Sequence, residues 1–331
     1  MSDAPISVEE FRATAGAIER EVGKVIVGQQ ALVRQLIVTL LAGGNALLEG
    51  VPGLGKTLLV RTLAQVIDCT FSRIQFTPDL MPADIVGGTI LAHDEASGER
   101  AFRFEPGPVF AHLVLADEIN RALPRTQSAL LEAMQERRVT VAKTTHNLPE
   151  PFFVLATQNP LEMEGTYPLP EAQLDRFFYK LDVYFPTLEE LLEIADRTTS
   201  ARQAQPVVVA HADTVRRMQL LARQVPIGSH VTEFAARLLK ATHPDDAAAP
   251  DLVKRYVRYG ASPRGLQAMV LGAKVTALLA GRYNVSFEDI QMAARPALRH
   301  RLILNFEGQA EGVTPDRLIE AALKGLAVKA R

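Results

Sequence analysis

The eight residues at positions 50–57, "GVPGLGKT", combine the residue types that bind phosphate groups. Gly50, four intervening residues, and then Gly55, Lys56 and Thr57 satisfy the pattern of a phosphate-binding loop between a strand and a helix. In such a loop, backbone N–H groups at the helix start surround the phosphates, Lys56 places a charge on the β- and γ-phosphates, and Thr57 binds Mg²⁺. A plain flexible turn is the alternative. We expect phosphates to contact the whole loop, which consists of Gly50, Val51, Pro52, Gly53, Leu54, Gly55, Lys56, Thr57 and Leu58.

Two neighbouring carboxylates end the apolar run "LVLADE" at residues 113–118. Asp117 suits the coordination of Mg²⁺, and Glu118 can orient and deprotonate a water that attacks a γ-phosphate. Because consecutive strand residues point in opposite directions, the two side chains are not expected to share one role. An acidic strand end at a solvated loop is the alternative. With the loop upstream, the pair favours hydrolysis of a nucleoside triphosphate.

Short apolar runs that alternate with helical segments must position these side chains. Near-continuous apolar strands separated by helices predict an α/β fold, in which helices cover both faces of a mainly parallel sheet. The runs lie at residues 45–50, 71–77, 112–118, 152–159 and 177–185. Residues 87–108 and 136–151 contain alternating apolar positions next to turns, and they predict two hairpins that precede strands of the sheet.

The pattern changes at Pro186, because from there on every apolar repeat has the helical period. We therefore predict a core at residues 1–185, with an N-terminal helix and two hairpin insertions, and an all-helical domain at residues 186–331. Four pairs of residues indicate helix starts: Ser7 with Glu10, Thr187 with Glu190, Ser286 with Asp289, and Thr314 before Pro315. The first helix should bury Phe11, Ala15, Ile18 and Val22.

The composition excludes several classes of protein. With 331 residues, of which 47% are apolar and 22% charged, the chain can form two compact domains and is not a disordered protein. Its net charge of −2 gives no general attraction to nucleic acids or anionic membranes. The single cysteine, Cys69, excludes a disulfide framework, and none of the seven histidines has metal-ligand spacing. No apolar run reaches the ~18 residues of a membrane span, so we expect a cytoplasmic protein.

The order of four motifs closely resembles the MoxR family of AAA+ ATPases. These motifs are "GVPGLGKT" (50–57), "LVLADEINRA" (113–122), "FFVLATQNP" (152–160) and "LPEAQLDRF" (169–177). Two further stretches between them match the same family, "QFTPDLMPADIVG" (75–87) and "FEPGPVF" (104–110). The resemblance covers roughly residues 20–310 and implies a P-loop AAA+ parallel-sheet domain followed by an α-helical lid domain.

The resemblance implies roles for two residues downstream of the carboxylates. Asn159 resembles the sensor that holds the attacking water or the γ-phosphate, although an Asn before Pro160 is also a common turn pair. Arg176 resembles the arginine finger that reaches the nucleotide of a neighbouring subunit. An ion pair of Arg176 with Asp175 or Glu171 is the alternative.

Three more residues match the family pattern. Arg264 follows a predicted helix start, where the helix dipole disfavours a cation by about 0.3–1 kcal/mol unless an anion lies nearby. It resembles the second sensor of AAA+ lids, which contacts the γ-phosphate, but an exposed Arg without a role is the alternative. Gly28 and Gln29 resemble the segment that packs on the adenine, and a simple loop between two helices explains them nearly as well.

As a member of this family, the chain would be an Mg²⁺-dependent ATPase with ATP and Mg²⁺ as cofactors. The resemblance implies a homo-oligomeric ring, with a hexamer expected, that remodels or matures other proteins, often partners that carry a von Willebrand factor A domain. The aromatic-hydrophobic-Gly pore loop of protein-threading relatives is not visible in "DLMPADIVGGTI" (79–90), which argues against threading.

Two other functions remain open from the sequence. A nucleic-acid motor is suggested because the two hairpins resemble insertions found in replicative helicase relatives, and Arg137, Arg138 and Lys143 lie near one of them. The net charge and the lack of interleaved aromatic residues weigh against it. A nucleotide-gated binding scaffold with slow turnover is the second. The complete set of Lys56, Asp117, Glu118, Asn159 and Arg176 favours an active enzyme over this scaffold.

Overall fold

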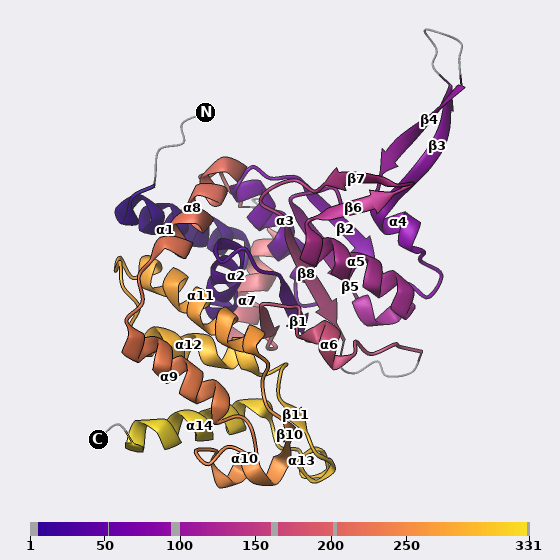
Figure 1. Cartoon of the computed structure of the whole chain (residues 1–331). Coiled ribbons are helices and arrows are strands. Elements are labelled where there is room, and N and C mark those ends of the chain that lie inside the picture. Colours follow the sequence, from indigo (N-terminus) through magenta and orange to yellow (C-terminus); the bar gives the residue numbers. More distant parts are fainter. Residues whose placement is uncertain (1–5, 52, 94–99, 160–164, 201–203, 330–331) are drawn as a thin grey trace.

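A five-stranded parallel sheet forms the centre of the first part of the chain (Figure 1). The computed structural model describes residues 6–51, 53–93, 100–159, 165–200 and 204–329. The strand order is β2-β5-β8-β1-β9, and every neighbouring pair is parallel. All five predicted runs are confirmed as strands: β1 (Ala46–Glu49), β2 (Phe71–Gln75), β5 (Leu113–Asp117), β8 (Phe153–Gln158) and β9 (Tyr179–Asp182).

Helices cover both faces of this sheet. Successive residues of a strand point to opposite faces, so their side chains pack into two different hydrophobic clusters. Leu113 and Leu115 belong to one hydrophobic cluster, whereas Val114 and Ala116 belong to another. The first cluster includes residues of α1 (Val8–Val25), α2 (Gln30–Leu41) and α3 (Lys56–Val66), and the second includes residues of α5 (Pro124–Glu136). The predicted start of α1 is confirmed: Ser7 Oγ accepts a hydrogen bond from Glu10 N at 3.1 Å.

Both predicted hairpins are present, and they pack against each other. The first consists of β3 (Gly87–His93) and β4 (Arg100–Pro106) and extends away from the body of the molecule (Figure 1). The second consists of β6 (Arg138–Val141) and β7 (Thr144–Asn147). The ring of Phe104 in β4 stacks on His146 in β7, with ring centroids 3.8 Å apart. Short elements join the hairpins and strands: α4 (Pro82–Val86), a 3₁₀ turn at Ile119–Arg121 and α6 (Glu171–Leu174).

Beyond Pro186 the chain is helical, as predicted, except for one small ribbon. Strands β10 (Val257–Tyr259) and β11 (Ile303–Leu304) pair in antiparallel fashion, so this part is not entirely helical. Two or three residues are too few to produce a period-2 signal, which is why the sequence did not indicate these strands. The helices are α7 (Leu188–Thr199), α8 (Ala212–Gln224), α9 (Ser229–Lys240), α10 (Asp251–Tyr256), α11 (Pro263–Leu279), α12 (Phe287–Leu298), α13 (Phe306–Ala310) and α14 (Pro315–Lys329).

The predicted helix starts in this part are also confirmed. Thr187 and Glu190 form a reciprocal capping box at α7, with Thr187 N donating to Glu190 Oε2 at 2.9 Å. Ser286 and Asp289 do the same at α12. Helix α14 begins at Pro315. Within the residues that the structure describes, no helix is long and apolar enough to cross a bilayer.

The helical part packs directly on the sheet part. Helices α1 and α2 both contact α11, and α12 contacts β9. One continuous hydrophobic cluster includes Phe11 of α1, Leu48 of β1 and Leu278 of α11. Because this cluster crosses the expected boundary between residues 185 and 186, the division into two domains stays a prediction.

Candidate active site

A cavity of about 400 Å³ lies where the carboxyl ends of β2, β5 and β8 meet the glycine-rich loop. Open parallel sheets bind ligands in this position, outside the carboxyl ends of the strands. Residues from three separate motifs meet here, although each was predicted from a different stretch of sequence. The cavity is lined by Gly53, Gly55, Lys56, Thr57, Leu58, Arg73, Gln75, Asp117, Glu118, Thr157, Gln158 and Asn159.

The loop has the backbone of a phosphate cradle. Gly53 and Gly55 adopt φ values of +85° and +73°, and apart from the adjoining residues no described atom lies within 4 Å of the position a Cβ would take at either residue. At Gly50, by contrast, a Cβ would come within 2.9 Å of Val183 Cβ, so the loop packs tightly on the residue that follows β9. Glycine is therefore required for backbone conformation at two positions and for close packing at the third. Pro52 lies outside the described residues. Val51 and Leu54, which belong to the same loop, are half-buried.

Lys56 begins α3 and points back along the loop. Its Nζ donates a hydrogen bond to Gly50 O at 2.6 Å. Burial lowers the pKa of the Lys56 ammonium, while the carboxylates of Asp117, Glu118 and Glu49 act in the opposite direction. A desolvated cation at the start of a helix attracts an anion strongly, because both the charge and the free N–H groups favour it.

The two carboxylates bind different side chains, and the separate roles expected for them stay a prediction. Asp117 Oδ1 accepts a hydrogen bond from Thr157 Oγ1 at 2.7 Å, and Asp117 Oδ2 forms an ion pair with Arg73 Nη2, also at 2.7 Å. Glu118 Oε2 accepts from Gln75 Nε2 at 2.9 Å. The cause differs from strand alternation, however, because Glu118 lies one residue beyond β5 with a left-handed backbone, φ +56°.

The sequence patterns did not identify Arg73, Gln75 and Thr157 as residues of this site. Strand β2 lies next to β5 in the sheet. Arg73 and Gln75 are two residues apart in β2, so their side chains lie on the same face of the sheet. A polar residue at every second position near the carboxyl end of an apolar strand was the available signal. Its meaning depended on the sheet order, which places β2 beside β5. Asn159, in contrast, lies in this cavity as expected and is 8% exposed.

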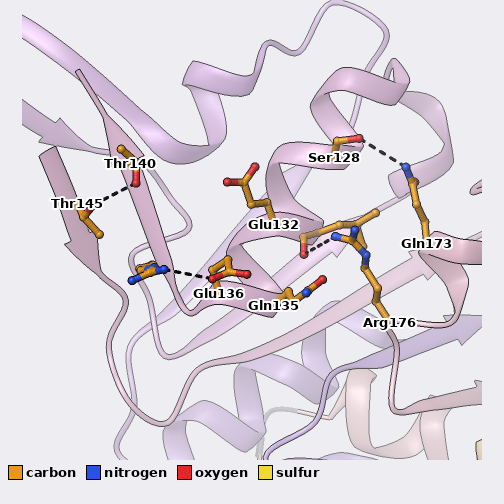
Figure 2. A pocket seen from close by; sticks show the side chains of 10 residues that line it. Ser128, Glu132, Gln135, Glu136, Thr140, Thr145, Gln173 and Arg176 are labelled. Carbon is orange, nitrogen blue, oxygen red and sulfur yellow. Dashed lines mark hydrogen bonds and ion pairs between the residues drawn. The ribbon is translucent and has the colours of Figure 1, made fainter. Parts of the chain in front are cut away.

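Arg176 lies outside this cavity. Figure 2 shows its side chain beside α5, where Arg176 Nη1 donates to Leu131 O at 3.3 Å. Glu132 and Glu136 of α5 line the same polar cavity of about 570 Å³. Among the described residues, the ion-pair partners of Asp175 are Arg264 and Arg301, not Arg176.

Arg264 is likewise absent from the lining of the loop cavity. It shares a cavity of about 790 Å³ with Arg176, between the sheet part and α11. Arg264 Nη1 lies 3.3 Å from Asp175 Oδ2, and this carboxylate supplies the anion that a cation at a helix start requires. The two arginines therefore lie on one face of the chain, separate from the loop that would bind phosphate.

Gly28 and Gln29 precede α2 and are not part of the cavity lining. Both have left-handed backbones, with φ values of 64° and 52°. A Cβ at Gly28 would lie 2.0 Å from Glu190 Oε1 at the start of α7. Close approach of α7 thus explains the glycine, and the adenine role stays a prediction.

Comparisons with known proteins agree with this arrangement. Residues 45–179 match the model of the ATPase family associated with various cellular activities (AAA), and residues 250–322 match the AAA lid domain. The chain is 42% identical to Chaperone MoxR1 of Mycobacterium tuberculosis over 98% of its own length and 85% of that protein. The chain belongs to the MoxR family of AAA+ ATPases.

Other relatives support the same membership. Protein MoxR of Paracoccus denitrificans is 30% identical over 98% of this chain and 99% of its own. A crystal structure of a candidate ATPase from Cytophaga hutchinsonii superimposes with a TM-score of 0.89 and 40% identity, and the match covers 96% of each chain. ATP hydrolysis is a property of this family, and the AAA and lid folds are both present.

The residues at the loop cavity fit a nucleotide with Mg²⁺. Thr57 and Asp117 provide a hydroxyl and a carboxylate, the oxygen ligands that Mg²⁺ prefers. Across the described part of the chain, no group of three or more His, Cys, Asp or Glu residues could hold a metal ion. Mg²⁺ at phosphate-transfer sites usually binds one or two protein carboxylates together with substrate phosphates.

Proposed function

We propose that this MoxR-family protein hydrolyses ATP in an Mg²⁺-dependent reaction and uses the energy to remodel or mature other proteins. The observation that carries the proposal is the convergence of Lys56, Thr57, Asp117, Glu118 and Asn159 on one cavity at the end of the sheet. These are the groups that bind phosphates, hold a divalent ion and activate water. Chaperone MoxR1, at 42% identity, supports the chaperone-like output.

Each residue has a chemical task in this proposal. The loop N–H groups and Lys56 bind the β- and γ-phosphates, Glu118 orients and deprotonates the attacking water, and Asn159 holds that water or the γ-phosphate. Thr57 and Asp117 would hold Mg²⁺, which neutralises charge on the phosphates when it is bound. Gln75 binds the Oε2 oxygen of Glu118, and a carboxylate has a second oxygen that can accept a bond from water.

Assembly into a ring completes the site. Arg176 faces a different cavity from the phosphate loop of its own chain, so we assign it to the nucleotide of a neighbouring subunit. A hexamer is the proposed form. Arg264 shares the face of Arg176, and we assign it to the same neighbouring nucleotide. A C-terminal lid that contacts the γ-phosphate across the interface would respond to hydrolysis.

The clients are proposed to be proteins in the cytoplasm, including partners with a von Willebrand factor A domain. Remodelling from outside is favoured over threading, because β3 is entered from α4 through Gly87 and Gly88, without the aromatic pore residue of threading relatives.

The ring proposal is tested by the ATPase rate per subunit as a function of protein concentration, with the mass measured by light scattering in the presence of ATP. We expect the rate to rise as the ring assembles. Arg176→Ala should assemble but lose activity by ~10³-fold or more, because the transition-state charge is no longer neutralised. Arg237→Ala, which removes an exposed cation of α9, is the matched control. A concentration-independent rate that is unaffected by Arg176→Ala would refute the shared site.

A nucleotide-gated scaffold with slow turnover is the second candidate. The observation in its favour is that both carboxylates are engaged by the protein itself. Asp117 pairs with Arg73, and Glu118 accepts bonds from Gln75 and Arg121. If ATP binding does not release these bonds, the protein would bind ATP without rapid hydrolysis.

A further inference from the structure

Three consecutive residues of the lid grip the segment that carries Arg176. They are Arg299, His300 and Arg301, which follow α12, and we call them the RHR triplet. Each contacts the stretch between α6 and the end of β9, at residues 175–182. The two segments are separated by more than a hundred residues in the sequence, so the contact joins the lid to the sheet part.

Arg301 makes the densest set of contacts. Its Nε donates to Asp175 Oδ1 at 2.8 Å, and its Nη2 donates to Asp175 O at 3.0 Å and to Phe177 O at 2.6 Å. Its Nη1 donates to Phe178 O at 3.3 Å and also to Ala297 O in α12. The guanidinium thus binds on both sides of residue 176, through a carboxylate and through backbone carbonyls.

The other two residues extend this grip. The buried His300 lies with its Nε2 3.1 Å from Phe177 O, where the nitrogen donates to the carbonyl. Arg299 pairs with Asp182 at the end of β9 and, through Nη2, with Asp316 Oδ2 of α14 at 2.6 Å. The triplet therefore fixes both ends of the segment from Asp175 to Asp182 against the lid.

Burial of the Arg301 side chain is unfavourable if that side chain only fills space. The Arg301 side chain is only 2% exposed, and burying a guanidinium costs several kcal/mol before its bonds are counted. An apolar side chain of similar volume would pack with less desolvation. The five donors of arginine in a fixed fork, in contrast, define the direction of the backbone that they bind. The backbone so defined lies on both sides of Arg176, at Asp175 and at Phe177 and Phe178.

Asp175 links the same grip to the second arginine of the shared face. Its carboxylate accepts bonds from Arg301 Nε, from Ser262 Oγ at 2.6 Å and from Arg264 Nη1 at 3.3 Å. Ser262 and Arg264 belong to the start of α11. One carboxylate therefore contacts the start of α11 and Arg301, which lies three residues beyond the end of α12.

We propose that Arg301 is a positioning residue that locks Arg176 to the lid of its own subunit, so that the lid and the finger move as one body. This inference rests on the proposed role of Arg176 at a neighbouring nucleotide. In a ring, the position of one lid then sets the rate of hydrolysis in the next subunit. Arg301 itself does not line the loop cavity of its own chain.

The test uses mixed rings of full-length chains, because a positioning defect should appear in the neighbour. Arg301→Lys keeps the charge but removes the fork, and we expect kcat to fall about 10-fold or more with little change in the affinity for a fluorescent ATP analogue. Glu118→Gln lacks the base but keeps its finger. When the two impaired variants are mixed in equal amounts, activity should recover to about a quarter of the wild-type rate per subunit, since one site in four then combines an intact base with an intact finger.

A control variant, an alternative test variant and a reference mixture separate the possible results. Arg295→Gln removes another arginine of α12, whose ion pair with Glu320 lies within the lid, and should leave the rate unchanged. Asp175→Asn is the second test variant if Arg301→Lys does not fold, since the backbone acceptors of Arg301 remain. Arg176→Ala mixed with Glu118→Gln is the reference pair for an arginine that acts across the interface.

Each outcome decides between the proposals. Recovery in both mixtures supports the lock. Two results overturn the lock while the Arg176→Ala mixture still recovers. One is a wild-type rate for Arg301→Lys alone, and the other is a rate in the Arg301→Lys mixture no higher than the mean of the two separate variants. Either result leaves the ring proposal standing. Failure of the reference pair to recover refutes the role of Arg176 and, with it, the lock.

Discussion

At the scale of single residues, the loop cavity depends on carboxylates that are held in place by uncharged and cationic neighbours. Thr157 links the strands β5 and β8 through Asp117 and also accepts a bond from Glu118 N at 2.8 Å. One hydroxyl therefore contacts the carboxylate of Asp117 and the backbone of Glu118. Its side chain is nearly fully buried, at 1% exposure, which limits the other positions that these groups can take.

Glu118→Gln is expected to reduce ATP hydrolysis by ~10²–10⁴-fold, because an amide cannot accept the proton of the attacking water. Binding of ATP should persist, since Lys56 and the loop are unchanged. Steady-state ATPase rates and nucleotide affinity are the measurements, and Glu233→Gln, an exposed carboxylate of α9, is the control. Turnover equal to wild type would favour the scaffold over the enzyme.

At the scale of elements, the start of α12 shows how one capping residue supports the lid. Asp289 is 1% exposed and accepts bonds from Ser286 N at 2.8 Å and from Arg282 Nη2 at 2.7 Å. It therefore satisfies a free N–H group at the helix start and pairs with a cation. Helix α12 in turn contacts α9, α11, α14 and β9, so its position affects the whole lid.

Asp289→Ala should lower the free energy of unfolding by about 2 kcal/mol, because it removes a cap and a hydrogen-bonded ion pair. Chemical denaturation in urea is the measurement. Glu288→Ala changes the neighbouring carboxylate, which is exposed, and should have an effect several times smaller. Equal losses of unfolding free energy in the two variants would show that the buried ion pair contributes nothing beyond the removal of one negative charge.

At the scale of the whole molecule, the junction between lid and sheet contains a titratable group. Burial is the main cause that holds the pKa of His300 well below its usual range, and the positive charge of Arg301 adds to it. His300 Nδ1 is buried and has no hydrogen-bond partner among the described residues. Protonation in the folded state would therefore place a charge where nothing accepts its proton.

This junction should make stability depend on pH. The unfolded chain binds a proton at His300 below pH ~6.5 while the folded chain does not, so the free energy of unfolding falls as the pH decreases below that value. The loss attributable to His300 is at most about 1.4 kcal/mol per pH unit. Urea denaturation between pH 7.5 and pH 5 is expected to show a shallower pH dependence for His300→Gln than for the wild type. Identical slopes would contradict this assignment.

Much of the fold could be predicted because its signals are local. The strands β1, β5 and β8 are mostly apolar runs of four to six residues, and the helix starts at Ser7, Thr187 and Ser286 each need only a partner three residues away. The phosphate loop is a contiguous motif whose backbone conformation follows from its glycines. In each case, neighbours in the sequence determine the structure, so the sequence alone was sufficient.

The tertiary structure decided which side chains meet. Arg73 reaches Asp117 because β2 lies next to β5, and no periodicity encodes that order. Arg264 pairs with Asp175 on the face of Arg176, and the RHR triplet grips the same segment from more than a hundred residues away. Such contacts depend on how whole elements pack, and packing energy is spread over many residues. The sequence thus determined the parts of the active site, and the fold determined that Arg176 and Arg264 belong to a different face from the phosphate loop.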